Sequence, residues 1–141
     1  MQQTESPAMS DKAKDPLPAV RRAAAVAMRD KPLNEARDVL TEVARQYPPG
    51  DKAYLDDLAA GCTGKEEAMY AHLLGRLGAL TLKWSDSFAD IACRLRPVNS
   101  VFALKDRALA ASLPPERRQQ AIDALSAIND KIAVDALKQI K

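Results

Sequence analysis

The sequence predicts an all-α protein, built as an α-solenoid in which about four antiparallel helix pairs stack on one another. Three observations support this prediction. Hydrophobic residues make up 47% of the chain, aromatic residues only 4%, and glycines number 5, so helix formers dominate and strand-forming runs are scarce. Apolar residues recur at steps of three and four. Prolines or aspartates mark short turns between these stretches.

Charge and hydropathy argue against several classes of protein. The 21 basic and 19 acidic residues leave a net charge of +2, too little for a strong field that would bind nucleic acid or a membrane surface. No stretch approaches the ~20 apolar residues of a membrane span. The polar start, MQQTESPAMSDKAK, lacks the apolar segment of a secretory signal. We expect a cytoplasmic protein if the chain is complete, and a periplasmic or exported one if it is a fragment.

The first helix is expected after a polar stretch. Residues 1–14 have no apolar pattern and predict a disordered tail or linker, so the helical repeat domain covers residues 15–141. Asp15 is placed to cap the first helix. Pro16 would take the first helical position, where a missing N–H is harmless. Pro32 should end this helix, because proline cannot continue it.

Three further helices are expected in the first half of the chain. The second covers about residues 33–47, where apolar residues keep helical spacing until Pro48-Pro49-Gly50. Asp51 should cap a shorter third helix that ends near Gly61. A fourth helix should follow Gly64, which sits in the turn between the two.

The second half carries four more expected helices. Ser85 should cap the fifth helix, and Trp84 should pack back on Phe88 or Ala89 as a buried hydrophobic staple. Pro97 should end that helix. The last three helices are marked by their apolar residues: Val98, Val101, Phe102, Leu104 and Ala108, then Ala121, Ile122, Leu125 and Ile128, then Ile132, Ala133, Ala136, Leu137 and Ile140.

The lengths and connections of these helices favour a solenoid over a closed bundle. Short connections make consecutive helices antiparallel neighbours. A helix pair that recurs every ~30 to 40 residues has the period of an α-solenoid. A closed bundle would require longer helices of similar length, whereas the third helix is short and the chain holds 9 prolines.

The stretch DPLPAVRRAAAVAMRD, at residues 15–30, resembles the second helix of a HEAT repeat. In such a helix an aspartate leads, Val-Arg follows, and small residues permit close stacking. The matching residues are Asp15, Val20, Arg21 and Ala24. The resemblance implies a ladder of hydrogen bonds between the aspartate and arginine of neighbouring repeats. The candidate members of the ladder are Asp15, Arg21, Asp106 and Arg107.

Two longer stretches carry a second resemblance: KAYLDDLAAGCTGKEEAMYAHL at residues 52–73, and residues 84–137. The signature of the second stretch consists of Trp84, Phe88, Ala89, Asp90, Ile91, Ala92, Arg94, Leu95, Pro97, Val101, Ala103, Leu104, Arg107, Ala108, Ala121, Asp123, Ala124, Leu125, Ile128, Asn129, Asp130 and Ala136. It looks like the HEAT-like segment of bacterial, planctomycete-type membrane-bound dehydrogenase or haem-binding-domain proteins. Those large exported proteins join a sugar-dehydrogenase-like β-propeller to helical repeats, and often to a c-type cytochrome domain.

This second resemblance implies a non-catalytic scaffold or protein-interaction module. The chemistry of the family lies in its other domains, and this chain has neither propeller strands for a quinone cofactor nor a CxxCH for haem, so no cofactor is expected. The implied partner is a dehydrogenase-like or cytochrome domain, in the same chain or in a separate one. Two positions depart from the family pattern: Cys93 stands where an aromatic residue is expected, and Arg96 where a histidine is usual.

Few residues in the sequence are capable of catalytic chemistry. His72 is the only histidine, and no carboxylate lies one helical turn away to orient its ring. Cys62 and Cys93 form no CxxC pattern; we expect two buried thiols, with a single disulfide as the alternative. Neighbours such as Asp56-Asp57 and Glu66-Glu67 point in different directions on a helix and form no acid–base pair. We therefore expect neither an enzyme nor a metal site.

A basic region supports an alternative function. Residues 94–118 hold six basic residues against two acidic ones, a local charge of +4. The candidates for a binding surface there are Arg94, Arg96, Arg117 and Arg118. Helical-repeat proteins that grip DNA, such as HEAT-like alkylpurine DNA glycosylases, place such residues along a concave groove. The alternative is a stand-alone nucleic-acid-binding protein or glycosylase-like enzyme, whose binding would weaken steeply with salt.

Overall fold

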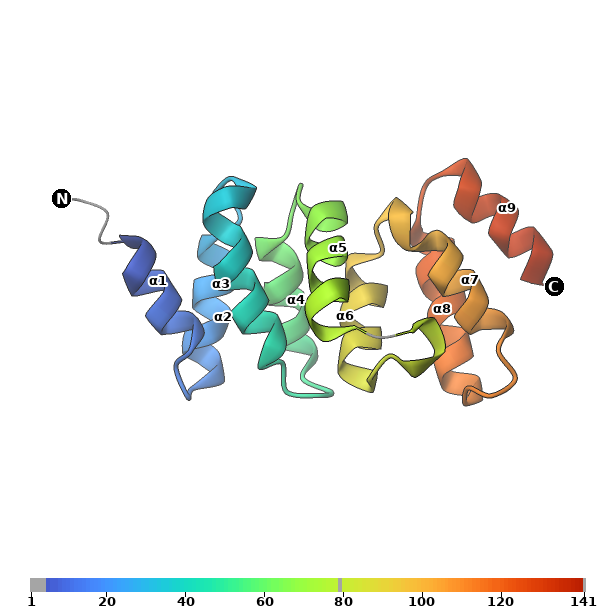
Figure 1. Ribbon diagram of the computed structural model, residues 1–141, viewed down its shortest axis with the longest axis horizontal. Helices are drawn as coiled ribbons and strands as arrows, with labels where there is room; N and C mark the ends of the chain where they lie inside the picture. The colour runs from blue at the N-terminus through green and yellow to red at the C-terminus, as the bar shows by residue number, and fades with distance from the viewer. Residues whose placement is uncertain (1–4, 79, 141) are drawn as a thin grey trace. The chain divides into compact units, whose positions relative to one another are not determined.

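The regular secondary structure of the described residues is entirely helical, which confirms the predicted all-α class. The computed structural model describes residues 5–78 and 80–140, with side chains from Met9 onward. In these ranges the chain forms nine α-helices and two short 3₁₀ helices and no strand (Figure 1). The chain divides into two compact units, Met1–Met69 (unit 1) and Tyr70–Lys141 (unit 2). None of the helices in the described ranges has the length and apolar character needed to cross a membrane.

A helix occupies much of the range expected as a tail. α1 spans Glu5–Ala13, so the predicted disorder of residues 1–14 is wrong for residues 5–13, while residues 1–4 lie outside the described part. Ala13 is fully buried, and its carbonyl accepts a hydrogen bond from Gln46 Nε2 at 3.1 Å. α1 packs against two neighbouring helices of unit 1. Sequence periodicity misses this helix because tertiary packing supplies most of the stability of a short helix.

The next helix begins later than the sequence predicts. α2 spans Pro18–Ala27, so Pro18 takes the first helical position that was expected for Pro16. Leu17 is its N-cap, and no side chain caps this end. The Asp15 carboxylate instead accepts a hydrogen bond from the Leu17 N–H at 2.8 Å. Asp15 therefore shapes the turn before α2, and the prediction that it caps the helix is wrong.

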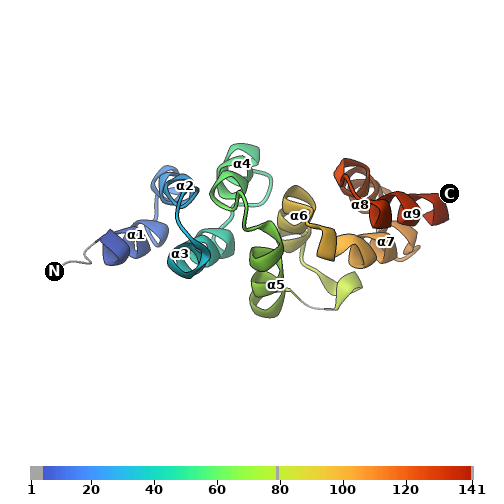
Figure 2. The same cartoon turned by 90° about the horizontal axis from the view of Figure 1, so that it is seen from above.

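The helices of unit 1 form two layers. α3 spans Leu33–Arg45, α4 spans Lys52–Gly61, and α5 spans Glu66–Leu77 and continues into unit 2. α1 packs beside α3, and α2 packs beside α4, so the pairs alternate between the two layers (Figures 1 and 2). Asp51 caps α4, as predicted, by accepting a hydrogen bond from the Tyr54 N–H at 3.1 Å.

The close packing of α2 on α4 depends on a glycine. A Cβ atom at Gly61, the last residue of α4, would lie 2.2 Å from the carbonyl oxygen of Ala25 on α2. It would also lie 2.8 Å from a methyl group of Leu40 on α3. Because real Cβ atoms do not approach a backbone oxygen so closely, no other residue fits at this point without moving a helix.

Unit 2 holds the rest of the helices. They are η1 (Thr81–Lys83), α6 (Asp86–Leu95), η2 (Val98–Ser100), α7 (Val101–Leu109), α8 (Pro115–Ala127) and α9 (Lys131–Ile140). Ser85 caps α6 as predicted, accepting a hydrogen bond from the Phe88 N–H at 3.1 Å. α7 packs on α8, α9 packs on both, and η1 lies against α7 (Figure 1). The predicted sixth helix is divided into η2 and α7, and η1 was not predicted.

Gly61→Ala is expected to lower the free energy of unfolding by about 2 kcal/mol or more. The clash with the Ala25 carbonyl outweighs the roughly 1 kcal/mol by which alanine is the better helix former. Gly75→Ala in α5 is the matched control, because a Cβ there meets nothing within 4 Å. That control should stabilise the chain by about 0.5–1 kcal/mol in urea denaturation. Equal effects of the two substitutions would contradict the close approach of α2 and α4.

Candidate functional site

An aromatic cluster forms the centre of the site in unit 2. The Trp84 and Phe88 rings meet edge to face with their centroids 4.9 Å apart. Tyr70 lies 6.4 Å from Trp84 and 6.3 Å from Phe88, between ring centroids. Trp84 is 6% exposed. The prediction of a buried Trp84 that packs back on Phe88 is confirmed.

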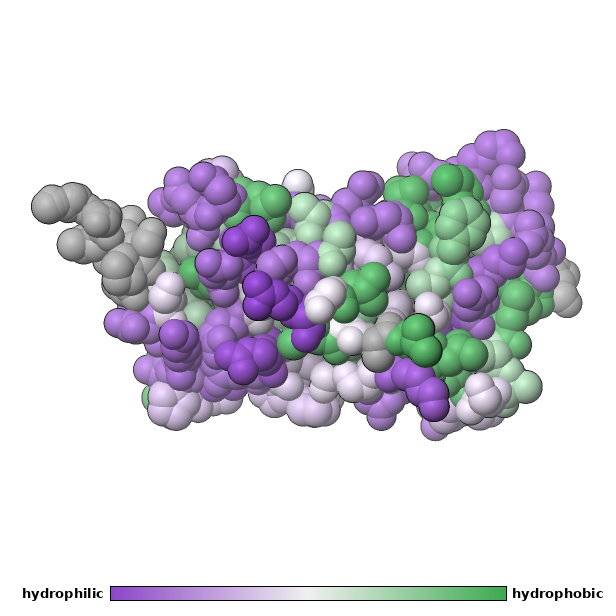
Figure 3. Space-filling model, viewed as in Figure 1, coloured by the Kyte–Doolittle hydropathy of each residue, from purple (hydrophilic) through white to green (hydrophobic). Residues whose placement is uncertain are grey.

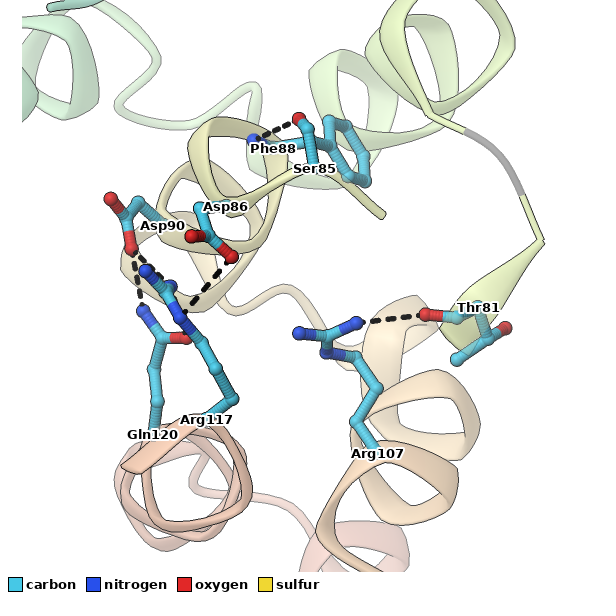
Figure 4. A network of polar contacts seen from close by, with 8 residues as sticks. All are labelled: Thr81, Ser85, Asp86, Phe88, Asp90, Arg107, Arg117 and Gln120. Carbon is cyan, nitrogen blue, oxygen red and sulfur yellow. Dashed lines mark hydrogen bonds and ion pairs between the residues drawn. The ribbon is translucent and has the colours of Figure 1, made fainter. Parts of the chain in front are cut away.

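A buried arginine covers this cluster. Arg107 on α7 is 2% exposed, and its guanidinium carbon lies 5.0 Å from the centre of the Trp84 ring. Its Nη1 donates a hydrogen bond to the Thr81 carbonyl at 2.9 Å (Figure 4). Burial lowers the pKa of the Arg107 guanidinium. Its Nε and the Trp84 Nε1 find no hydrogen-bond acceptor among the described residues. The face of the Trp84 ring and the Thr81 carbonyl therefore supply most of the interactions that offset the cost of burying the Arg107 charge.

Unit 1 buries an arginine in a similar way. Arg21 on α2 lies 5.4 Å from the centre of the Tyr54 ring, and its Nε donates to the Tyr54 hydroxyl at 3.0 Å. Its other nitrogens donate to the carbonyls of Asp15 at 2.8 Å, Pro16 at 3.1 Å and Gln46 at 3.2 Å. Arg21 therefore joins the turn before α2 to the end of α3 and to α4.

These contacts differ from the ladder that the resemblance implies. Arg21 reaches the main chain of Asp15, while the Asp15 carboxylate accepts from Leu17. Arg107 reaches the main chain of Thr81, while its neighbour Asp106 is exposed. Both arginines thus bond to carbonyl oxygens within their own unit. The predicted ladder pairs the side chains of aspartate and arginine, whereas Arg21 bonds to the main chain of Asp15 and Arg107 to that of Thr81.

The four arginines of the expected binding surface have different surroundings. Arg117 on α8 is paired with α6: its Nη1 lies 2.8 Å from Asp90 Oδ1, and its Nε lies 3.5 Å from Asp86 Oδ1 (Figure 4). Gln120 also donates to Asp90 at 2.9 Å. Arg94 and Arg118 are half-buried, and Arg96 is exposed. Arg117 therefore acts as a tie between two helices, and Arg96 is the one of the four that is exposed.

The two cysteines are buried thiols in different units. Both are free, so the alternative of a disulfide between them is wrong. Burial raises the pKa of Cys62 and of Cys93 to about 12 each. At neutral pH both therefore stay protonated, and a protonated thiol is a poor nucleophile. Within the described ranges, no three side chains of histidine, cysteine, aspartate or glutamate converge to hold a metal ion.

A pocket of about 500 Å³ lies in unit 1, between the α2–α3 turn and the α4–α5 turn. Arg29 and Lys31 line it on one side and Lys65 on the other. The Lys65 ammonium donates to the carbonyls of Met28 and Arg29 at 3.0 Å each, and to that of Gly61 at 3.3 Å. Because it bonds to carbonyls at the ends of α2 and α4, Lys65 acts as a C-cap for both helices.

Unit 2 exposes a group of large apolar side chains. We define the η1–α7 surface as Leu80, Leu82, Phe102 and Leu109, whose exposed fractions are 78%, 44%, 69% and 50%. In Figure 3, hydrophobic side chains gather over η1 and α7. The apolar pattern of the sequence groups Phe102 with the other apolar residues of its predicted helix. A helical projection already separates it, because Val101, Leu104 and Ala108 share one face and Phe102 lies on the opposite one.

Comparison with known proteins places the chain in no family. No protein-family profile, no curated protein and no solved structure matches it.

Trp84→Ala is expected to lower the free energy of unfolding by about 3–5 kcal/mol, because it removes a buried ring from the core. Phe102→Ala is the matched control in the same unit, since Phe102 is exposed, and it should change stability by less than about 0.5 kcal/mol. Thermal or urea unfolding of the two variants measures the difference. Unaltered unfolding of Trp84→Ala would refute its place in the core.

The cysteines should react slowly with a disulfide reagent such as DTNB at pH 8. With pKa values of about 12, roughly one thiol in ten thousand is ionised at that pH, and both side chains are buried. In urea the ordinary pKa returns, and both thiols should react at least a hundredfold faster. Rapid labelling of the folded chain at pH 8, measured by absorbance, would contradict the burial of the thiols.

Proposed function

We propose that this chain is a non-catalytic helical-repeat scaffold that binds a protein partner. The observation that carries the proposal is the η1–α7 surface, where four large apolar side chains face solvent on one unit. Single apolar side chains scattered on a surface are ordinary, whereas a group of large exposed apolar side chains on neighbouring elements is typical of interaction sites in folded proteins. The protonated state of both thiols at neutral pH also argues against a catalytic cysteine.

A solenoid of HEAT-like pairs is the architecture that we propose for this scaffold. The two layers of unit 1, with α1 beside α3 and α2 beside α4, support it because stacked helix pairs produce such an alternation. The resemblance of residues 15–30 and 84–137 to HEAT-like segments supports it independently. By that resemblance, the partner is a dehydrogenase-like or cytochrome domain, in cis or in trans.

The location of the protein follows from the partner. If the chain works beside a dehydrogenase or cytochrome domain of the exported family, it functions in the periplasm or outside the cell. If it acts alone as an adaptor, it functions in the cytoplasm. The alternative function is nucleic-acid binding through the candidate surface of Arg94, Arg96, Arg117 and Arg118. Of these four arginines, Arg96 is the exposed one.

Co-elution and a DNA titration together test the proposed function. The chain should co-elute in size-exclusion chromatography with a purified cytochrome or dehydrogenase domain of the suspected family. Duplex DNA at physiological salt should bind with a Kd weaker than about 10 μM, in the range of non-specific contacts. DNA binding that is tight, that weakens steeply between two salt concentrations and that requires Arg96 would instead establish the alternative.

A further inference from the structure

We infer that the η1–α7 surface docks an acidic amphipathic helix of a partner protein. The inference rests on the proposed function and specifies the chemistry of the partner. Four features support it: the spacing of the apolar side chains, the area they expose, the charge around them, and the hydrogen bond that ties η1 to the core.

The spacing of the apolar side chains suits a helix. Phe102 and Leu109 lie seven residues apart on α7, two helical turns, so their side chains stand on one side of the helix about 10 Å apart. Leu82 lies in η1 and Leu80 directly precedes it, and η1 packs beside α7. A docked helix presents apolar anchors at i, i+4 and i+7, which span the same distance of about 10 Å.

The exposed area suits a short segment. The four side chains expose on the order of 400 Å² of apolar surface. A stable protein–protein interface buries about 800 Å² on each partner. The η1–α7 surface is therefore too small for a stable homodimer face, and it matches the apolar side of a single helix of a few turns.

The net positive charge of unit 2 favours an acidic partner. Residues 70–141 carry eleven basic and seven acidic residues, a net charge of +4, whereas residues 1–69 carry ten and twelve, a net charge of −2. Lys83 follows Leu82 directly and is exposed. Lys105 and the exposed Asp106 both lie between Phe102 and Leu109 on α7, so two ammonium groups stand beside the surface against one carboxylate. The Lys105 ammonium donates to the neutral side-chain oxygen of Gln139. Carboxylates beside the apolar anchors of a partner would meet these ammonium groups.

A hydrogen bond ties η1 to the core of unit 2. The Thr81 carbonyl in η1 accepts from Arg107, which is buried against Trp84. Leu80 and Leu82 on either side of Thr81 are therefore held beside α7 by a core residue. A preformed surface loses less conformational entropy on binding, which favours affinity.

A synthetic peptide tests the inference on the full chain. The probe is a fluorescein-labelled peptide of about 18 residues with leucines at i, i+4, i+7 and i+11, a glutamate beside each leucine, and alanine or glutamine at the remaining positions to favour a helix. The matched probe replaces every glutamate with lysine. Fluorescence anisotropy at low salt should show the glutamate peptide binding at least about tenfold more tightly than the lysine peptide. Phe102→Ala should weaken binding of the glutamate peptide by about tenfold or more. Leu17→Ala in unit 1, also at an exposed leucine, should leave it unchanged.

Several outcomes would overturn the inference. Equal binding of both peptides would show that the surface does not prefer an acidic partner. Binding that survives Phe102→Ala but weakens in Leu17→Ala would show that the peptide binds unit 1 instead. Self-association that is lost in Phe102→Ala would make a second copy of the chain the occupant. Co-elution with a partner domain that survives Phe102→Ala would overturn this docking surface while the proposed function stands. Failure of the unaltered chain to co-elute would overturn the proposed function alone, because peptide binding is measured separately.

Discussion

The guanidinium of Arg107 is buried over the Trp84 ring, and the assembly of unit 2 around η1 depends on how that charge is accommodated. An arginine cannot lose its proton in a protein, so burial obliges the chain to supply acceptors and polarisable faces. Trp84 supplies the face, and the Thr81 carbonyl supplies an acceptor. Arg21 meets the same requirement in unit 1 with the Tyr54 ring and hydroxyl and with carbonyls at two chain turns.

This constraint connects the core of unit 2 to its surface. Because Thr81 bonds to Arg107, the leucines on both sides of it are held at the solvent beside α7. On α8, Arg117 is held in a comparable way by Asp86 and Asp90 of α6, so a basic side chain that looks available in the sequence is occupied between helices. The exposed apolar side chains, and not the arginines, are therefore the basis of the proposed interaction. The hydrogen bond from Arg107 to Thr81 holds two of these side chains beside α7 before a partner binds, which favours affinity.

The sequence predicts the helices better than it predicts the contacts between them. Apolar periodicity and the caps Asp51 and Ser85 locate helix starts correctly, because these signals are local. α1 is missed because its stability comes from packing on α2 and α3, which no local pattern encodes. The bonds from Arg21 to the Gln46 carbonyl and from Arg107 to the Thr81 carbonyl could not be predicted, because these acceptors lie 25 and 26 residues away on the main chain. The exposure of Phe102 could have been predicted from its position opposite Val101, Leu104 and Ala108.

Methyl NMR spectroscopy of the leucines tests most directly the claim that η1 and α7 form a preorganised docking surface. The full chain, labelled with ¹³C at leucine methyl groups, is titrated with the acidic amphipathic peptide. Our account predicts that the methyl signals of Leu80, Leu82 and Leu109 shift together and saturably, while those of Leu17 and Leu33 in unit 1 stay in place. Shifts confined to unit 1, or no saturable shift at Leu80, Leu82 and Leu109, would contradict it.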